Sequence, residues 1–354
     1  MTSQAIERSA GNGAGSRPAG GMTRRRFIRI SGAVAGLSIA ALGGWTRLAA
    51  GSPLLHEWTG IALGADACLR LYHPDAAEAE RLIADALAEV HRMERVFSLY
   101  DKTSALCRLN RDGVLVDPPQ ELVELVAASV GYARATSGAF DATVQPLWDV
   151  YAGHFGVAGA DPDGPPPSAI DRALAKCGYR RVSVDATRIR FDQAGMAMTL
   201  NGIAQGYITD RVAELLRARG VAHTLIDMGE TRALDDHPSG RPWSVGIQDP
   251  SHTGIIKTID LDNQAISTSG GYGTKFDAAG RFNHIFDPAT GSCATRYRSV
   301  SVIAATATCA DALSTAFSVM PIDRVGGVLA ETGAVAAYYV LNDNSIVEKT
   351  PEAG

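Results

Sequence analysis

The chain has 354 residues, of which 46% are apolar, enough for one large domain or two small ones. Residues 1–50 contain seven Arg and one Glu, so the overall charge of −5 leaves −11 on the remainder, which is not expected to bind nucleic acid through its net field. The five scattered cysteines contain no C-x-x-C pair, which argues against a zinc site and against a disulfide framework.

The N-terminal segment has the layout of an export signal. Residues 1–23 are rich in Gly, Ala and Ser, three arginines follow at Arg24 to Arg26, and residues 30–42 are apolar and small. Basic residues before a modest apolar run indicate export. The arginines are followed by Phe27-Ile28, a combination that is typical of a twin-arginine signal.

We expect this signal to occupy residues 1–50, to be cleaved near Ala50 and to be recognised by the twin-arginine translocase. The rest of the chain, residues 51–354, then forms one domain located in the periplasm. A retained membrane anchor is the alternative, but the apolar run is rich in glycine and is followed by Arg47.

The first part of the domain is predicted to contain both strands and helices. Residues 54–72 contain a turn that leads into a first strand. Residues 75–97 have the periodicity of an amphipathic helix with Asp75 as its N-cap. Further along, helices are predicted over residues 119–135 and 168–176, and residues 182–191 alternate like a hairpin.

Residues 196–230 are predicted to form a strand, a glycine turn, a helix and a second strand. Met196 to Leu200 have the pattern of a short buried strand, and the apolar spacing from Ile208 onward is helical. That helix ends at Gly220, which follows the last apolar position as a C′ glycine does. Residues 223–228 form the second strand.

Glycines mark the turn before this helix. Asn201, Gly202 and Gly206 form the predicted turn. A glycine turn at a helix N-terminus can bind an anion such as phosphate, because free backbone N–H groups and the helix dipole both favour negative charge. Tight packing of the backbone is the other explanation for glycines at these positions.

The last third of the chain is predicted to be mainly strands, with a polar, glycine-rich connection over residues 266–273. Strands are expected over residues 243–248, 255–261, 281–286, 335–341 and 346–349, and helices over residues 308–316, after an apolar run at 300–305, and 323–332. Several of these strands are joined by short turns. The expected fold class is therefore mixed α/β (α+β), with largely antiparallel sheets flanked by helices, and not a doubly wound parallel sheet.

Asp311 and Thr315 lie four residues apart in a predicted helix and therefore on one helical face. A carboxylate and a hydroxyl placed in this way are hard oxygen ligands that suit Mg²⁺. An exposed Asp in the first helical turn, favoured there by the helix dipole, is the alternative interpretation.

Six motifs follow one another in an order that is similar to a known family. They occupy residues 97–110, 137–148, 200–212, 267–272, 284–291 and 309–316, and the likeness extends over most of residues 55–345. Together they resemble the ApbE family of FAD:protein FMN transferases. The resemblance implies an ApbE-like fold for residues 51–354, and transfer of FMN from FAD to a Ser or Thr hydroxyl of a partner protein with release of AMP.

The amino-acid sequences of two motifs are most similar to one branch of this family. The sequences L-N-G-I-A-Q-G-Y at 200–207 and M-G-E at 228–230 resemble the NosX branch, accessory proteins of nitrous-oxide reductase maturation. Members of that branch carry twin-arginine signals and are thought to attach flavin to NosR. The resemblance therefore implies a NosR-like acceptor flavoprotein at the periplasmic face of the membrane.

The resemblance also implies a set of site residues. Mg²⁺ would be held by the Gly202 backbone carbonyl, Asp311 and Thr315. His284 and Asp311 would be the catalytic residues, with His284 as general base because its ordinary pKa lies near working pH. Contacts with FAD would come from Leu63, Tyr100, Ala139, Phe140, Asp141, Thr199, Gln205 and Ile285. On composition alone, Tyr100 and Phe140 also suit core packing, and His284 also suits a structural role.

The chain departs from the family pattern at three places. Gln205 stands where the family usually has Lys, Thr199 stands near a usual acidic residue, and Gly229-Glu230 replaces Gly-Gly. Because glutamine carries no charge, whatever the usual lysine does for phosphate is missing here. Two functions stay open: an enzyme that attaches FMN to a partner, and a non-catalytic periplasmic protein that binds or delivers flavin.

Overall fold

The computed structural model describes residues 54–62, 65–251 and 254–352. The predicted export signal, residues 1–50, and the predicted FAD contact Leu63 lie outside the described residues. No helix within the described ranges is both long enough and apolar enough to cross a lipid bilayer.

A single sheet runs through the molecule, and all of its neighbouring strands are antiparallel. Within the described residues it has eight strands, in the spatial order β1 (Leu54–Ala62), β2 (Ala65–His73), β6 (Thr224–Asp227), β7 (Thr231–Leu234), β10 (Ala265–Ser269), β11 (Ser299–Ala304), β12 (Ala336–Val340) and β13 (Ile346–Lys349). The predicted mixed α/β class with antiparallel sheets is confirmed.

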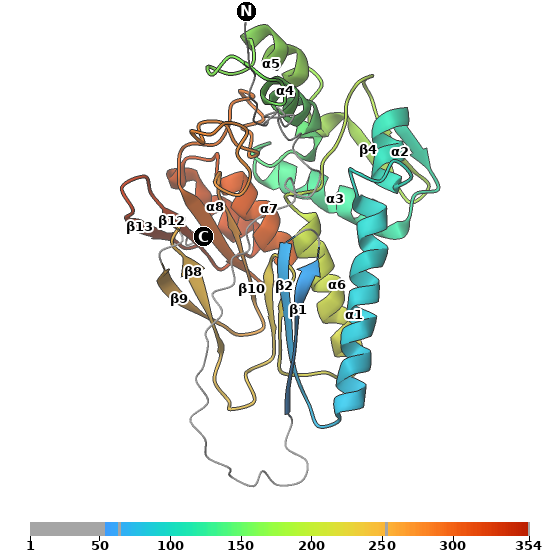
Figure 1. Cartoon of the computed structure of the whole chain (residues 1–354), viewed down its shortest axis with the longest axis vertical. Helices are drawn as coiled ribbons and strands as arrows, with labels where there is room; N and C mark the ends of the chain where they lie inside the picture. The colour runs from blue at the N-terminus through green and yellow to red at the C-terminus, as the bar shows by residue number, and fades with distance from the viewer. Residues whose placement is uncertain (1–53, 63–64, 252–253, 353–354) are drawn as a thin grey trace, which may run out of the picture.

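The two faces of this sheet are covered differently (Figure 1). Helices α1 (Ala76–Phe97), α3 (Gln120–Ala135), α6 (Ala204–Ala218), α7 (Ala307–Phe317) and α8 (Val325–Thr332) supply the main core. The hairpin of β8 (Trp243–Gln248) and β9 (Ile255–Leu261) covers the other face. Side chains alternate between the two cores, so Val302 in β11 joins the helix core while its neighbour Ile303 joins the hairpin core.

A smaller lobe lies at the top of Figure 1. It has its own apolar cluster, to which Leu147 and Tyr151 of α4 (Gln145–Phe155), Ala173 of α5 (Pro167–Leu174) and Phe286 contribute. To its right in Figure 1, α2 (Ala105–Asp112) adjoins a second sheet of β3 (Val114–Val116), β5 (Arg188–Phe191) and β4 (Val182–Asp185).

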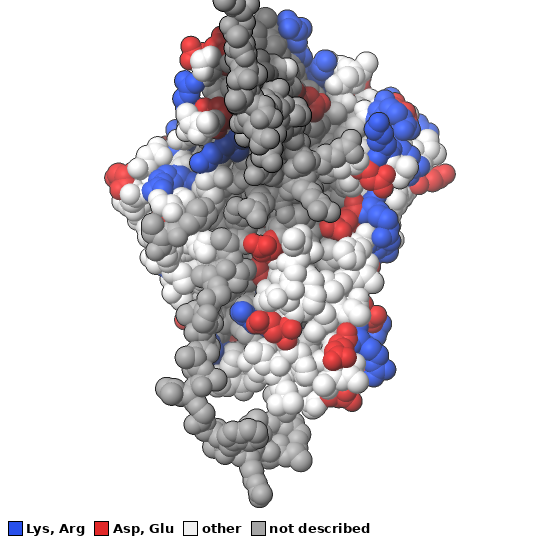
Figure 2. Space-filling model, in the orientation of Figure 1, with Lys and Arg blue, Asp and Glu red and all other residues white. Residues whose placement is uncertain are grey.

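Charge is unevenly distributed on the face drawn in Figure 2. Lys and Arg side chains gather at the upper right, over the region where Figure 1 places α2 and β4. Acidic side chains are mixed among them, and Arg111 pairs with Asp112 at 2.6 Å while Arg190 pairs with Asp192 at 2.7 Å. Exposed pairs of this kind contribute about 0 to 1 kcal/mol each, so they do little to hold the fold.

The helical predictions hold because their end signals are satisfied. Asp75 caps α1 by accepting hydrogen bonds from the backbone N–H groups of Ala77 and Glu78, at 2.8 and 3.1 Å. Gly220 follows α6 with a φ of +77°, the left-handed conformation expected of a C′ glycine.

The strand predicted over residues 196–200 is wrong. Met196, Met198 and Leu200 are buried, but the backbone hydrogen bonds of the segment do not go to a neighbouring strand. Asn110 donates its side-chain amide to the Met198 carbonyl and accepts from the Met198 N–H, both at 2.8 Å, while the Thr199 N–H donates to the Ala142 carbonyl at 2.8 Å. A side-chain amide and a loop carbonyl thus satisfy the groups that a strand ladder would have paired.

Other differences concern element type and boundaries. Residues 54–62 and 65–73 form two paired antiparallel strands and not a turn followed by one strand, and within the described residues 281–286 make only isolated bridges. Helix α6 begins at Ala204, which places Gly206 inside its first turn. The segment predicted as a polar connection begins with strand β10, whose Ser267 and Ser269 hydroxyls lie 3.1 and 2.8 Å from the Ser314 hydroxyl of α7.

Candidate active site

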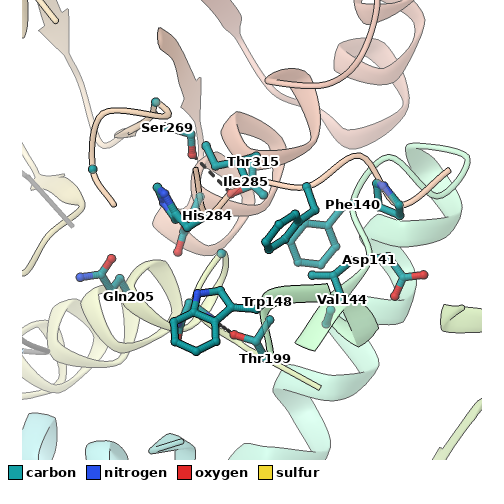
Figure 3. A pocket seen from close by; sticks show the side chains of 18 of the residues that line it. Phe140, Asp141, Val144, Trp148, Thr199, Gln205, Ser269, His284, Ile285 and Thr315 are labelled. Carbon is teal, nitrogen blue, oxygen red and sulfur yellow. Dashed lines mark hydrogen bonds between the residues drawn. The ribbon is translucent and has the colours of Figure 1, made fainter. Parts of the chain in front are cut away.

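One cavity lies beside the start of α6, where the smaller lobe meets the main sheet (Figure 3). Six segments line it: the connection from α3 into α4, residues 199–205, the β6–β7 turn, the end of β10 with the loop after it, residues 284–288, and α7. The segments are far apart in the sequence, so the cavity exists only in the folded chain.

The cavity brings together most of the site residues predicted from the sequence. Its lining includes Ala139, Phe140, Asp141, Thr199, Gly202, Gln205, His284, Ile285, Asp311 and Thr315. Tyr100 is not among the residues that line it; this residue lies in the loop that follows α1 and is 48% exposed. The structure therefore gathers these residues in one place, apart from Tyr100 and the undescribed Leu63.

Close contact between α6 and α7 sets the position of Asp311. A Cβ atom on Gly206 would lie 2.3 Å from the Ala307 carbonyl oxygen, so a glycine is required for the helices to pass this closely. The Gly206 N–H donates to the Asp311 carboxylate at 3.0 Å. Asp210, one turn further along α6, accepts hydrogen bonds from the Ala307 and Thr308 N–H groups, both at 2.8 Å, and so caps the N-terminus of α7.

Asp311 is 3% exposed, and burial raises the pKa of its carboxyl group to about 7. The Gly206 N–H opposes this shift because it stabilises the carboxylate. One turn along α7, the Thr315 hydroxyl lies 3.3 Å from the Ser269 hydroxyl (Figure 3) and 3.0 Å from the position that a Cβ on Gly202 would take. The Gly202 backbone, the Thr315 hydroxyl and the Asp311 carboxylate thus border the same cavity.

These three groups fit the predicted Mg²⁺ ion. Oxygen donors from one carboxylate, one hydroxyl and one backbone carbonyl match the preference of Mg²⁺, which usually keeps several water ligands. No group of three or more His, Cys, Asp and Glu side chains in the described ranges is placed to hold a metal ion. An ion bound here would therefore depend strongly on Asp311, the charged member of the set.

His284 is held in the orientation of a base. Its Nδ1 lies 3.2 Å from the Thr274 carbonyl oxygen, so Nδ1 carries the proton and Nε2 keeps its lone pair. Desolvation lowers the pKa of the imidazole, which keeps the ring neutral near pH 7. The backbone of Gly273 passes close to this ring, since a Cβ there would lie 3.3 Å from the His284 Cε1 atom.

The opposite side of the cavity is apolar and rigid. Figure 3 shows Phe140, Asp141 and Val144 across the cavity from His284. The Asp141 carboxylate does not face the cavity but holds the turn: it accepts from the Thr143 N–H at 2.8 Å, from the Thr143 hydroxyl at 2.6 Å and from the Tyr179 N–H at 2.8 Å. Its side chain therefore fixes the position of Phe140, which is 3% exposed.

The cavity lining also includes residues that have no predicted role, among them Trp148, Glu230, Ser269 and Tyr272. Trp148, Ser269 and Tyr272 lie inside the family motifs, so the order of the motifs points to them. Glu230 stands out in the sequence only as a departure from the usual Gly-Gly. Its burial, at 5% exposure, results from the β6–β7 turn and could not be read from neighbouring residues.

Comparison with known proteins agrees with this geometry. Residues 63–339 match the model of the ApbE family. The chain belongs to the ApbE family. It is 30% identical over 314 residues to an FAD:protein FMN transferase of Treponema pallidum, covering 81% of this chain and 84% of that protein. A second FAD:protein FMN transferase, from Klebsiella pneumoniae, is 30% identical over 282 residues, which are 76% of this chain and 79% of the relative.

Solved ApbE structures share the fold. The ApbE protein of Thermotoga maritima superimposes with a TM-score of 0.73 at 29% identity, covering 84% of this chain and 97% of its own. The apo form of the Pseudomonas stutzeri flavinyl transferase ApbE gives a TM-score of 0.70 at 27% identity, covering 85% and 96%. The expectation that this ApbE-family chain is an enzyme, a transferase, is confirmed.

Proposed function

We propose that this chain transfers FMN from FAD to a Ser or Thr hydroxyl of a partner protein, with release of AMP. The observation that carries this proposal is the convergence of Gly202, His284, Asp311 and Thr315 on one cavity that also has an apolar aromatic side at Phe140. The names of the family relatives supply the substrate class.

The reaction is a phosphoryl transfer. The acceptor hydroxyl oxygen forms a new bond to the phosphorus on the FMN side of the pyrophosphate, and the bond from that phosphorus to the bridging oxygen breaks, so that AMP leaves with that oxygen. The hydroxyl proton goes to the free Nε2 of His284, whose Nδ1 is fixed by the Thr274 carbonyl. The protein must therefore hold the hydroxyl in line and balance the pyrophosphate charge.

Mg²⁺ would balance that charge, acting as a Lewis acid on the phosphate oxygens. Asp311, Thr315 and the Gly202 carbonyl would hold it. The Gly206 N–H keeps the Asp311 carboxylate aligned, and the serine hydroxyls of β10 keep the Ser314–Thr315 turn of α7 in place. Phe140 and Ile285 would pack against the flavin, on the part of the cavity that Asp141 stiffens.

We also propose an acceptor protein and a cellular location, which the motif sequences and the N-terminal arginines suggest. The L-N-G-I-A-Q-G-Y and M-G-E forms favour the NosX branch, and with it a NosR-like membrane flavoprotein as the acceptor in nitrous-oxide reductase maturation. The paired arginines favour export to the periplasm by the twin-arginine translocase.

Replacing all of Arg24, Arg25 and Arg26 by lysine should keep a folded precursor in the cytoplasm. Normal export of that variant would indicate another export route.

A second function has its own supporting observation. No Lys or Arg is among the described residues that line the cavity, and Gln205 occupies the usual lysine position. A cavity without a fixed cation suits a protein that binds or delivers flavin without turnover, because phosphate transfer needs positive charge.

Release of AMP decides between the two functions. Purified protein is incubated with FAD, Mg²⁺ and a NosR-like acceptor domain, and AMP and acceptor mass are measured. AMP formed in equal amount to the FMN-modified acceptor supports the transferase. FAD binding with no AMP, in the presence of an acceptor that another ApbE enzyme does modify, supports the carrier.

A further inference from the structure

The cavity contains more negative charge than the predicted cation site requires. Asp311 and Glu230 both line it, and its described lining includes no Lys or Arg. Asp141 also borders the cavity, but its carboxylate turns away and accepts hydrogen bonds from Thr143 and from the Tyr179 N–H. Asp311 and Glu230 remain, and neither forms an ion pair with a Lys, Arg or His in the part of the chain that the structure describes.

A tight turn places Glu230 in the cavity. Gly229 has a φ of +99°, and the Met228 N–H donates to the Glu230 carbonyl at 3.3 Å, which closes the connection between β6 and β7. The residue after Glu230, Thr231, pairs with Ile266 of β10. Anchored on both sides, the Glu230 side chain is 5% exposed.

Both carboxyl groups are buried, at 5% exposure for Glu230 and 3% for Asp311, and the Asp311 charge acts on Glu230. The Ser267 hydroxyl and the Thr268 backbone N–H stabilise the Glu230 carboxylate through hydrogen bonds, but neither group carries a positive charge. Carboxylates this deeply buried are unfavourable unless they are paired with a positive charge or coordinate a metal. The two carboxylates therefore lack a positive charge that a bound cation would supply.

The amide of Gln205 is a separate sign that a ligand belongs here. Gln205 is 5% exposed, and its Nε2 atom is buried without a hydrogen-bond partner. It lies against the turn, 2.6 Å from the position that a Cβ on Gly229 would take, and it lines the same cavity. A buried amide group without a partner is unfavourable, so it is expected to meet a polar group when the cavity is filled.

We propose that Glu230 is a second carboxylate ligand of the divalent cation held by Asp311, and that this chain binds the cation through two carboxylates. The proposal rests on the proposed function, from which it takes the cation. It also explains why Gln205 and Glu230 occur together. A lysine at position 205 would lie beside Glu230 and pair with it, whereas the neutral amide leaves the carboxylate free for the cation.

Binding of Mn²⁺ to the flavin-free protein tests the proposal without any transfer reaction. Mn²⁺ replaces Mg²⁺ at oxygen sites, and the free ion is counted by electron paramagnetic resonance. Glu230→Gln should weaken Mn²⁺ affinity at least tenfold. The matched control is Glu214→Gln, which changes an exposed glutamate on α6 that pairs with Arg211 at 2.7 Å; its affinity should stay within twofold of the parent.

A structural role for Glu230 would give a different result. If the glutamate only supports the turn, Glu230→Gln lowers the melting temperature of the cation-free protein and leaves Mn²⁺ affinity within twofold, which would overturn the proposal. As a ligand, it should leave that melting temperature unchanged or raise it, because a buried repulsion is removed. If Glu230→Gln does not fold, Glu230→Asp, which withdraws the carboxylate by one methylene, is held to the same affinity threshold.

This test and the test of the proposed function can fail separately. Asp311→Asn should abolish Mn²⁺ binding if the cation site exists at all. A parent protein that binds Mn²⁺ through both carboxylates but releases no AMP would contradict the transferase and keep the two-carboxylate site. If Asp311→Asn abolishes Mn²⁺ binding while Glu230→Gln binds Mn²⁺ like the parent, the two-carboxylate site is contradicted and the proposed transferase is unaffected.

Discussion

Gly206 of α6 lies against the Ala307 carbonyl of α7 so closely that a Cβ atom would come within 2.3 Å of it. The same glycine donates its N–H to the Asp311 carboxylate, so the crossing of the two helices and the position of the candidate cation ligand depend on one residue.

Gly206→Ala should therefore damage both stability and function. The added methyl group must push α7 away, and overpacking of this kind costs about 1 to 3 kcal/mol. Asp311 moves with α7, so AMP release and Mn²⁺ affinity should both fall. Thermal unfolding, metal titration and AMP release measure these effects.

The chain offers a matched control in α3. A Cβ on the exposed Gly131 would meet no atom within 4 Å, so Gly131→Ala should stabilise the helix by about 0.5 to 1 kcal/mol and leave AMP release unchanged. Wild-type activity in Gly206→Ala would show that the close contact between α6 and α7 does not set the site.

Asp311→Asn separates the charge of this residue from its hydrogen bond. The asparagine oxygen still accepts from the Gly206 N–H, but the side chain no longer balances a divalent cation. AMP release should fall by about 10² to 10³, the usual loss when one electrostatic group of a transition state is removed. Thr315→Val should weaken transfer less, and Thr315→Ser should restore it. Full Mg²⁺-dependent activity in Asp311→Asn would mean that the cation binds elsewhere.

The stability of the folded protein should depend on pH differently with and without the bound cation. In the folded protein the pKa of Asp311 is raised to about 7 from an ordinary 3.8, and the pKa of Glu230 is raised as well. Between about pH 4 and 7 the folded state therefore keeps protons that the unfolded state has lost, so these groups make the cation-free protein less stable as pH rises through this window.

Mg²⁺ binds the ionised carboxylates, so its stabilising effect should grow over the same pH window. At a hundredfold excess over its Kd, a cation that binds only the folded state adds about 2.7 kcal/mol to the unfolding free energy. Melting curves from pH 5 to 8, with and without Mg²⁺, measure the difference. An increment that is constant with pH, or that survives in Asp311→Asn, would contradict the assignment.

The sequence predicted those features of the fold that depend on residues close together in the chain, and it missed those that depend on distant residues. The caps of α1 and α6, at Asp75 and Gly220, are local and were found. The error at residues 196–200 arose because Asn110, which pairs with Met198, lies far away in the sequence. Ser267 and Ser269 looked like loop residues because the hydroxyls that they meet belong to α7.

The same reasoning applies to the site. The family motifs supplied most of the cavity because each motif brings one segment to it. The sequence did not indicate the role of Glu230, since its burial depends on the Gly229 turn and on the pairing of β7 with β10. Long-range packing, and not the residue pattern, places that carboxylate beside Asp311.

His284→Gln tests the general base. Removing such a base costs about 10² to 10⁴ in rate. Because desolvation lowers the pKa of His284, the parent should keep its activity below pH 6.5 at saturating Mg²⁺ and lose it only when the ring becomes protonated. The variant should lose this acid limb. His91→Gln, on the exposed side of α1, is the control; an unchanged pH profile in His284→Gln would assign the histidine a structural role.

The last prediction concerns Gln205 and Glu230 together. A lysine at position 205 would place its ammonium group against the Gly229 turn, beside the Glu230 carboxylate. In Gln205→Lys the two charges should pair, which should weaken Mn²⁺ affinity about tenfold, or 1.4 kcal/mol, and should leave the rate of AMP release no higher than in the parent.

The double variant Gln205→Lys with Glu230→Gly restores the residues that the family usually has. With Glu230 absent, the lysine is free to meet the pyrophosphate through a charge-assisted hydrogen bond. AMP release should then exceed that of Gln205→Lys alone, and FAD should protect the double variant against thermal unfolding more than it protects the single one. The alternative result is that both variants bind Mn²⁺ and release AMP as the parent does. In that case the side chain at position 205 interacts neither with Glu230 nor with the phosphates. The neutral amide of Gln205 is then not the reason that the Glu230 carboxylate is free to bind the cation.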